Sequence, residues 1–375
     1  MSANKVVRVG VIGCGEITQV VHLPNLHYMS DRFQVTFLCD ISNNALSHCS
    51  KTIAGPPVKT TRFAEELCAS PDVDLVLIAN SDSFHVPHAC LALKHNKHVF
   101  IEKPMAMSLQ DADAVIAAEK AAGGNKVFVG YMRRHADAFR DIEREIKTPG
   151  LRGLRYARVS GIVGWSKPLV AQSGTFPRYF SDYTDEDKAE LKKRTSAVQE
   201  QGLHKELGIP VNDRTAATWS LLGGLGSHDL SAMRELFGMP SAVLGASMVQ
   251  TPASPFWSCL FQYPDFAVAY ESGIDSVDRF DAYIEMFFDE KTVRLSYDSP
   301  YIKGLPVKIH VKEKTRDGAF TESTVRRTFE DPYTQQMREL YEFVADGKPT
   351  KTTAEDARKD VEIFGMFMKA CKLDG

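Results

Sequence analysis

The stretch that decides the fold is Val9-Gly10-Val11-Ile12-Gly13-Cys14-Gly15-Glu16-Ile17, near the start of the chain. The preceding run, from residue 5 to residue 12, is apolar and rich in valine, which is typical of a strand buried on both faces of a parallel sheet. Gly13 and Gly15 then allow a tight turn and a close approach of the backbone to a pyrophosphate. The helix that begins near Glu16 directs its free N–H groups toward such an anion. The pattern predicts a nucleotide-binding strand, turn and helix.

Two further residues qualify this prediction. Thr18 stands where a third glycine often follows, so we expect the helix and the strand to pack slightly less closely. Asp40 ends a second predicted strand (33–39), about 20 residues past the turn, where an acid accepts hydrogen bonds from the adenosine ribose. Its carboxylate repels a 2′-phosphate and no arginine directly follows it, so the sequence favours NAD over NADP. Taken alone, Asp40 is equally consistent with a helix N-cap or a turn.

The composition is that of a globular protein with room for two domains: 375 residues, 43% hydrophobic and 25% charged. A formal net charge of −3 lacks the basic excess of a nucleic-acid-binding protein. No apolar stretch has membrane-spanning length, and no signal-peptide pattern opens the chain. The seven cysteines form no Cys-x-x-Cys pair, which argues against a disulfide framework and a zinc site. We therefore expect a cytoplasmic protein with reduced thiols and no metal.

The pattern of elements changes near residue 134. Before it, predicted strands (5–12, 33–39, 74–79, 98–101 and 126–131) alternate with predicted helices (44–53, 63–68, 86–94 and 109–122). This rhythm predicts a doubly wound parallel sheet, an α/β Rossmann domain over residues 1–134.

After residue 134, strands follow one another without intervening helices (154–163, 242–250, 257–263, 266–272, 282–288, 292–297, 307–312 and 321–328). Helices are predicted over 137–146, 186–206, 215–237, 333–345 and 354–372. Residues 135–375 are therefore expected to form an α+β domain with a large, open, mostly antiparallel sheet. We expect this domain to bind the substrate and to mediate oligomerisation.

A candidate catalytic residue follows the fourth of the early strands, in Val99-Phe100-Ile101-Glu102-Lys103-Pro104. Lys103 comes just past the strand's carboxyl end, beside the crevice where ligands bind in such sheets. Its ordinary pKa is about 10.4, and both burial and a positively charged nicotinamide ring would lower it toward neutrality. Lys103 is thus a candidate general base, whereas the same lysine without this context reads as a surface residue.

With these residues the chain resembles the glucose–fructose oxidoreductase/inositol dehydrogenase/rhizopine-catabolism (Gfo/Idh/MocA) family over nearly its whole length. The matching motifs are Gly13-x-Gly15-x-Ile17, Asp40, residues 78–85, Glu102-Lys103-Pro104 and Gly226-Ser227-His228. Residues 131–134 (Tyr-Met-Arg-Arg) resemble a segment of inositol dehydrogenases in particular. The resemblance implies a Rossmann domain followed by an open sheet with helices on one face. The other face commonly forms a dimer interface, so we expect a homodimer or homotetramer.

The resemblance also implies roles for individual residues. It implies that NAD(P) contacts the glycine turn and residues at the strand ends: Gly13, Cys14, Gly15, Glu16, Ile17, Asp40, Asn80, Ser81, His85, Glu102 and Lys103. His228 is expected to orient or deprotonate the reacting hydroxyl. Arg133 is expected either to donate to substrate hydroxyls or to form a salt bridge. Trp165 and Tyr183, with Tyr156, are candidates for an apolar wall against a sugar ring, although such aromatics are more often core residues.

Four departures from the family pattern stand out. Asn80-Ser81-Asp82 replaces the usual Thr-Pro-Asn-like turn. Gly224 stands four residues before His228, where many members carry an aspartate, and Ser231 replaces a common aspartate after it. Residues 166–212 are longer than a simple member needs, and the sequence does not decide whether they cover a substrate or a subunit contact.

Three functions are compatible with these residues. The leading hypothesis is an NAD-dependent dehydrogenase or reductase of a cyclic polyol, sugar or sugar derivative, inositol-like by its Met-Arg-Arg segment. The second is a dihydrodiol-type dehydrogenase or a carbon–carbon double-bond reductase with a non-sugar substrate. The third is a non-catalytic, nucleotide-sensing regulator. Lys103 and His228 favour an enzyme, while Gly224 leaves the regulator open.

Overall fold

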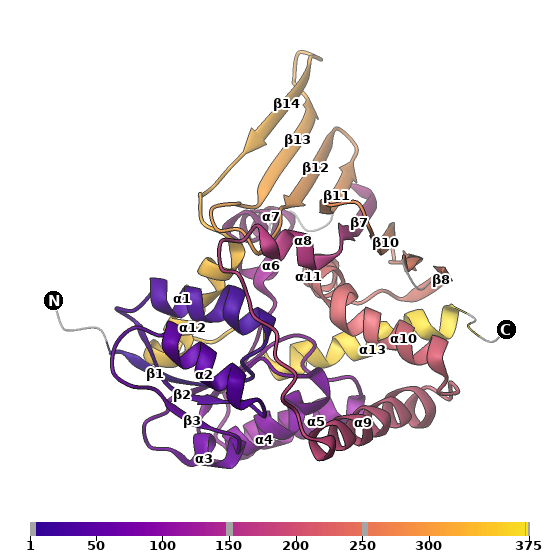
Figure 1. Ribbon diagram of the computed structural model, residues 1–375. Helices are drawn as coiled ribbons and strands as arrows, with labels where there is room; N and C mark the ends of the chain where they lie inside the picture. The colour runs from indigo at the N-terminus through magenta and orange to yellow at the C-terminus, as the bar shows by residue number, and fades with distance from the viewer. Residues whose placement is uncertain (1–4, 148–152, 250–253, 372, 374–375) are drawn as a thin grey trace. The chain divides into compact units, whose positions relative to one another are not determined.

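The computed structural model describes residues 5–147, 153–249, 254–371 and 373 (Figure 1). The chain forms two compact units, and each is drawn from separate stretches of sequence. Unit 1 takes the described residues up to 130 together with 175–211 and 336–361; unit 2 takes 131–174, 212–335 and the remainder from 362. The sequence predicted a single boundary after residue 134, so the return of two later segments to unit 1 is a departure from that prediction.

Unit 1 is built on a six-stranded parallel sheet with the strand order β3-β2-β1-β4-β5-β6. The strands are β1 (Val7–Ile12), β2 (Phe33–Cys39), β3 (Lys59–Thr61), β4 (Leu75–Ile78), β5 (His98–Ile101) and β6 (Val127–Val129). The order reverses between β1 and β4, and in such sheets ligands bind outside the carboxyl ends of the strands at that point. The predicted Rossmann architecture is confirmed, with β3 as a strand that the sequence pattern did not show.

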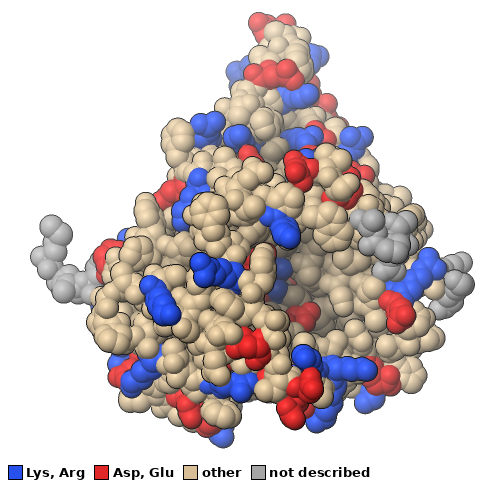
Figure 2. Space-filling view, viewed as in Figure 1, with Lys and Arg blue, Asp and Glu red and all other residues tan. Residues whose placement is uncertain are grey.

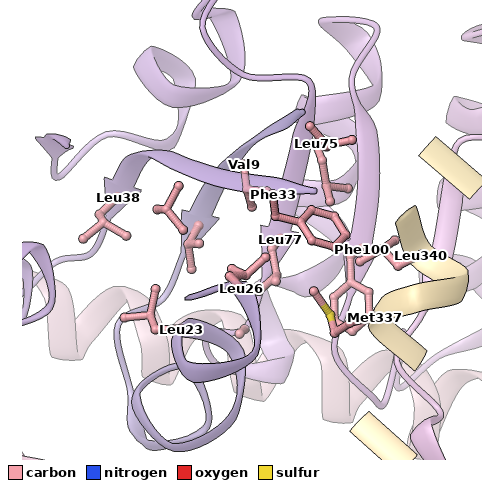
Figure 3. Packing of buried hydrophobic residues seen from close by; sticks show 14 of the residues in the cluster. Val9, Leu23, Leu26, Phe33, Leu38, Leu75, Leu77, Phe100, Met337 and Leu340 are labelled. Carbon is pink, nitrogen blue, oxygen red and sulfur yellow. The ribbon is translucent and has the colours of Figure 1, made fainter. Parts of the chain in front are cut away.

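Helices cover both faces of this sheet. They are α1 (Leu23–Tyr28), α2 (Asn43–Thr52), α3 (Ala64–Ala69), α4 (His85–Lys94), α5 (Leu109–Ala121) and α12 (Pro332–Asp346), with a short turn of 3₁₀ helix, η2 (Asp82–Phe84). Successive residues of β1 face opposite sides of the sheet. Val9 packs in the core with α1, α2 and α12 on one face, and Gly10 leaves room for Leu67 of α3 on the other. Figure 3 shows Val9 and Phe100 in the core with Met337 of α12.

Residues 175–211 form a segment that we call the strap. It contains α9 (Asp185–Gln199) and a π-helical stretch, η3 (Glu200–Glu206). Figure 1 shows extended chain leading into α9. Thr184 caps α9 by accepting the N–H of Asp187, whose carboxylate accepts the N–H of Thr184 in return. The strap therefore completes unit 1, to which it is hydrogen-bonded at both ends.

Unit 2 is built on an eight-stranded sheet with the order β14-β13-β12-β11-β7-β10-β9-β8. Only the pair β7 and β10 is parallel among these neighbours, so the predicted, mostly antiparallel sheet is confirmed. The strands are β7 (Leu154–Gly164), β8 (Ala242–Val249), β9 (Phe256–Gln262), β10 (Ala267–Asp275), β11 (Phe280–Phe288), β12 (Lys291–Tyr297), β13 (Lys308–Lys314) and β14 (Phe320–Val325). Two predicted element ends, residues 250 and 372, lie outside the described residues.

Helices pack on one face of the second sheet. The helices of unit 2 are α6 (Met132–His135), α7 (Asp137–Lys147), α8 (Ser166–Ala171), α10 (Asp213–Leu221), η4 (Leu222–Gly226) and α11 (Ser227–Phe237), with α13 (Ala354–Ala370) divided between the units. Of these, α11 contacts β7, and α6 places Arg133 over rings of β11 and β12. On β12, Val293 and Leu295 are buried on this face, whereas Arg294 between them is partly exposed on the other. The alternation leaves one polar face, as is common in antiparallel sheets.

Several properties concern the chain as a whole. Acidic and basic side chains are interspersed on the face in Figure 2. No helix in the described stretches is both long enough and apolar enough to cross a membrane. All seven cysteines are free thiols. Within the described residues, no three His, Cys, Asp or Glu side chains are grouped so that they could hold a metal ion.

Candidate functional site

The glycine turn has the shape that a close-approaching ligand requires. Gly13 has φ +99°, and a Cβ there would lie 2.6 Å from the backbone nitrogen of Asn80, so no side chain fits. A Cβ on Gly15 would meet nothing within 4 Å, so the turn is open above it. Thr18, in place of the third glycine, is fully buried, and its hydroxyl donates to the Gly13 carbonyl at 2.6 Å. Thr18 also begins a π-helical turn, η1 (Thr18–His22), which leads into α1.

Asp40 lies at the end of β2, beside this turn. Its Oδ2 accepts the N–H of Cys14 at 2.7 Å, and its Oδ1 accepts the N–H of Ser42 at 2.8 Å. Burial raises the pKa of the Asp40 carboxyl, and the two backbone N–H groups oppose that rise. Because each carboxylate oxygen can accept a second hydrogen bond, Asp40 retains the capacity to accept from a ribose diol.

The turn after β4 adds a further polar group to unit 1. The Asn80 Nδ2 contacts His88 Nδ1 at 3.0 Å, while the Asn80 Oδ1 is buried and has no hydrogen-bond partner within the described residues. Such an orphaned acceptor, next to an open glycine turn and a strand-end carboxylate, is what a dinucleotide site supplies. The residues present therefore fit NAD(P).

Glu102 follows β5 and is 5% exposed. Burial alone would raise the pKa of its carboxyl, but the hydrogen bond from His22 Nε2 at 2.8 Å and the positive charge of Lys103 lower that pKa below its ordinary value. Glu102 is therefore ionised at neutral pH. His22 was missed by sequence reasoning, because no local signal joins a histidine after the glycine turn to an acid 80 residues away.

Lys103 is half-buried, and its bond to Pro104 is cis. His85 fixes this segment: its Nδ1 lies 2.8 Å from the Pro104 carbonyl oxygen and its Nε2 lies 3.1 Å from that of Asn80. A neutral imidazole has only one N–H, and burial lowers the pKa of His85, so the shorter contact is the hydrogen bond. His85 thus ties the turn after β4 to the segment that carries Lys103.

A cavity of about 210 Å³ lies within unit 2. Three residues singled out from the sequence line it: Arg133, Trp165 and His228. Its other lining is mostly apolar, namely Met132, Val163, Leu169, Leu225, Ile274, Phe280 and Pro300, with Gly164, Ser166, Tyr301 and Tyr333. The volume suits a small ring rather than a drug-sized ligand, for which about 300 Å³ or more is usual.

Arg133 forms a buried ion pair with Asp229 of α11. Its guanidinium also lies over the rings of Tyr297, at 4.7 Å, and Phe280, at 5.8 Å. Burial raises the pKa of the Asp229 carboxyl, although Arg133 opposes that rise. Both readings of Arg133 therefore have a structural basis, because it forms a salt bridge and also borders the cavity.

The remaining aromatic candidates lie elsewhere. Tyr183 belongs to the strap in unit 1, where the charges of Asp40 and Asp182 contribute to raising its pKa after burial does, and it does not line the cavity. Tyr156 packs against Phe287 on the sheet of unit 2, with ring centroids 5.8 Å apart, and is likewise absent from the cavity lining. The sequence could not predict either position. Tyr156 lies on a strand, where successive side chains point to opposite faces of the sheet, and Tyr183 lies in a long loop.

Residues 7–131, which include the six-stranded sheet, are similar to proteins of known family. Residues 7–131 match the model of an oxidoreductase family with an NAD-binding Rossmann fold. Over these residues the chain is similar to the Gfo/Idh/MocA oxidoreductase family. The matched region covers the glycine turn, Asp40, the turn after β4 and the Glu102-Lys103-Pro104 segment.

Two relatives are similar to part of the chain. Inositol 2-dehydrogenase 3 of Saccharopolyspora erythraea is 31% identical over 145 residues, which are 39% of this chain and 42% of that protein. A 1-carboxy-3-chloro-3,4-dihydroxycyclohexa-1,5-diene dehydrogenase of Comamonas testosteroni is 34% identical over 116 residues, 31% of this chain and 28% of that protein. The chain thus spans less than half the length of either relative.

Similarity of fold extends over nearly the whole chain. Biliverdin reductase from Synechocystis, solved with biliverdin and NADP⁺, has a TM-score of 0.63 and 17% identity, covering 97% of this chain and 99% of that one. At this identity the likeness concerns the fold alone.

Proposed function

We propose that the protein is an NAD-dependent dehydrogenase or reductase that acts on a secondary alcohol or ketone of a cyclic polyol, sugar or sugar derivative. The observation that carries the proposal is the fixed segment at the end of β5. There an ionised Glu102 is held by His22, and His85 binds the carbonyl of Pro104 next to Lys103. The inositol dehydrogenase relative supports the substrate class.

The roles of the chain's own residues follow from their chemistry. Gly13, Gly15 and the following helix turn bind the pyrophosphate, and Asp40 accepts from the ribose diol. A bound nicotinamide supplies the hydride acceptor or donor. Cys14, Glu16, Ile17, Ser81 and Asn80 border the dinucleotide. In alcohol oxidation the O–H bond breaks, and its proton passes to the neutral amine of Lys103; in reduction the ammonium returns it.

The cavity of unit 2 supplies the other part of the proposal. Arg133 donates to a ring substituent, His228 orients the reacting hydroxyl, and Trp165 lies against the ring. We further propose that copies of the chain associate through the open face of the eight-stranded sheet, in the cytoplasm. That face carries polar side chains, among them Arg294, which is stacked on Tyr283 with 3.5 Å between guanidinium carbon and ring centroid.

The lining of the cavity favours a second candidate function. A polyol presents a hydroxyl on nearly every carbon, and each buried hydroxyl requires a partner. Most of the lining residues are apolar, which suits a ring with few hydroxyls better. A dihydrodiol-type dehydrogenase is therefore the alternative, and the Comamonas relative acts, by its name, on such a ring.

The test is a substrate panel. The purified protein is mixed with NAD⁺ or NADP⁺ and with myo-inositol, aldoses or alicyclic dihydrodiols, and nicotinamide absorbance is followed. We expect turnover with NAD⁺ and a ring alcohol. Lys103→Met is expected to lose roughly 10²- to 10⁴-fold in kcat while dinucleotide binding survives. Near-normal kcat in the folded variant would place proton transfer elsewhere, and dinucleotide binding without turnover on any alcohol would favour the regulator.

A further inference from the structure

The strap meets unit 1 at the ribose-binding turn after β2. Asp182 of the strap accepts the hydroxyl of Ser42 and, at 3.1 Å, the N–H of Asn44. Ser42 in turn donates its own N–H to Asp40 at 2.8 Å. One serine therefore links two carboxylates, one from the Rossmann core and one from the strap. Burial raises the pKa of Asp40, and the negative charge of the nearby Asp182 adds to that rise.

The strap also engages a cation at the same edge of the sheet. Arg62 directly follows β3, and its positive charge acts on Asp40 in the opposite sense to Asp182. Its guanidinium is paired with Asp187 of α9 at 2.7 Å. An arginine near this point is what accommodates the 2′-phosphate in NADP-binding Rossmann folds. In this chain the strap's own carboxylate neutralises that arginine.

We propose that Asp182 and Asp187 are specificity residues of the dinucleotide site, through which the strap disfavours a 2′-phosphate. Asp182 adds a second negative charge beside Asp40, and Asp187 withholds Arg62. A 2′-phosphate carries nearly two negative charges at neutral pH, so both effects weaken NADP and leave NAD largely unaffected. The inference rests on the proposed function, because it presupposes a dinucleotide at the glycine turn.

Family-level motifs did not point to these residues. Asp182 and Asp187 lie about 140 residues beyond Asp40 in the sequence, within the long segment whose role the sequence left undecided. Their contacts with Ser42 and Arg62 assign that segment to the cofactor side of unit 1. Tyr183, between them, belongs to the same group, with its pKa raised by burial and by the charges of Asp40 and Asp182.

The experiment measures the ratio of the dissociation constants of NAD⁺ and NADP⁺ by calorimetric titration of the full chain. The wild type is expected to favour NAD⁺. Asp182→Asn should narrow the preference by roughly fivefold, the effect of one partly screened charge. Asp187→Asn should narrow it further, because Arg62 becomes available. Asp185→Asn is the matched control: Asp185 lies on the same helix, its side chain is 95% exposed and pairs with Lys188, and the ratio should not change.

A second pair of variants makes the test independent of Asp182 and of its hydrogen bonds. If Asp187→Asn acts by releasing Arg62, adding Arg62→Gln to that variant should restore the preference for NAD⁺. An unchanged ratio in both Asp182→Asn and Asp187→Asn, with both dinucleotides still binding, would overturn the inference. So would a wild type that binds NADP⁺ more tightly. Failure of the wild type to bind either dinucleotide would instead overturn the proposed function on which the inference rests.

Discussion

The buried pair of His22 and Glu102 shows how single residues set the electrostatics of unit 1. Desolvation of Glu102 is the largest single effect and acts against ionisation. The 2.8 Å hydrogen bond from His22, the electrostatic effects of His22 and Lys103, and the N–H of Lys103 together outweigh it, so the pKa of Glu102 is lowered. Because the pKa of Glu102 is lower in the folded chain than in the unfolded one, the pair contributes stability above the ordinary glutamate pKa of about 4.3. That contribution is lost as the pH falls through the folded value.

The first prediction concerns His22→Ala. Without the histidine, burial raises the pKa of Glu102 above its ordinary value, and the carboxylate is left without its main partner. We expect the free energy of unfolding at about pH 7 to fall by roughly 3–5 kcal/mol, the cost of breaking a buried pair. The deficit should shrink as the pH falls toward about 5, because Glu102 is then protonated in the variant. Urea denaturation at both pH values measures it.

His27→Ala is the control for this prediction, because His27 lies on α1 and is exposed. The unfolding free energy of the His27→Ala variant should match that of the wild type at both pH values. A deficit in His22→Ala that stays constant or grows on acidification would show that Glu102 does not remain ionised in the wild type.

At the residue scale, the sequence predicted local chain geometry correctly, whereas the ligand roles of Gly13 and Asp40 stay predictions. Gly13 needs a positive φ, and Asp40 follows the end of a strand at a characteristic distance from the turn. Both properties depend on residues that are close in sequence. Contacts between distant stretches could not be predicted, as with His22 and Glu102 or Asp182 and Ser42. No pairing rule links residues that only the tertiary fold brings together.

At the scale of elements, the strap is anchored at its far end by a helix terminus. The Glu206 carboxylate accepts the N–H of Leu109 at 2.7 Å and of Gln110 at 3.0 Å, in the first turn of α5. These donors have no partner within their own helix, and the positive end of the helix dipole favours an anion there. Ser108 caps the same helix by accepting the N–H of Asp111. Glu206 therefore joins the strap to α5 by two charge-assisted hydrogen bonds.

The second prediction is that Glu206→Ala lowers the free energy of unfolding by about 1–2 kcal/mol, the range for loss of a helix-capping acceptor. Glu200→Ala is the matched control, because Glu200 begins the same π-helical stretch and pairs with His204. Thermal and urea unfolding of the two variants make the comparison. Equal losses in both would mean that the contact with α5 contributes nothing beyond an ordinary surface charge.

Element prediction missed β3 and could not give the position of the strap. β3 has three residues, of which two are exposed, so no hydrophobic alternation marks it. The strap carries charged side chains on a well-capped helix, which predicts α9 correctly but says nothing of where the helix lies. Long, apolar or strongly alternating segments such as β2 and β7 were predicted at close to their observed bounds.

At the scale of the whole molecule, the first unit is not a continuous domain. Its core includes Met337, Leu340 and Phe343 of α12, each at most 1% exposed, packed with β1, β4 and β5 (Figure 3). Alternation of strands and helices detects the sheet but not a helix contributed from about 200 residues further along the chain. The domain predicted as residues 1–134 therefore lacks α12, which supplies part of its hydrophobic core.

The last prediction follows from the absence of α12 from residues 1–134. A fragment of residues 1–134 should not unfold cooperatively, because Leu340 and its neighbours are absent and each buried side chain of this kind contributes roughly 1.5–3 kcal/mol. The full chain should unfold cooperatively in urea, and Leu340→Ala within it should cost about 2–5 kcal/mol. Leu244→Ala is the control, since Leu244 is 59% exposed in unit 2. Near-ultraviolet circular dichroism and urea titration distinguish the outcomes. A fragment with a sharp, native-like transition would show that α12 is dispensable and that the sequence-based boundary describes an independent folding unit.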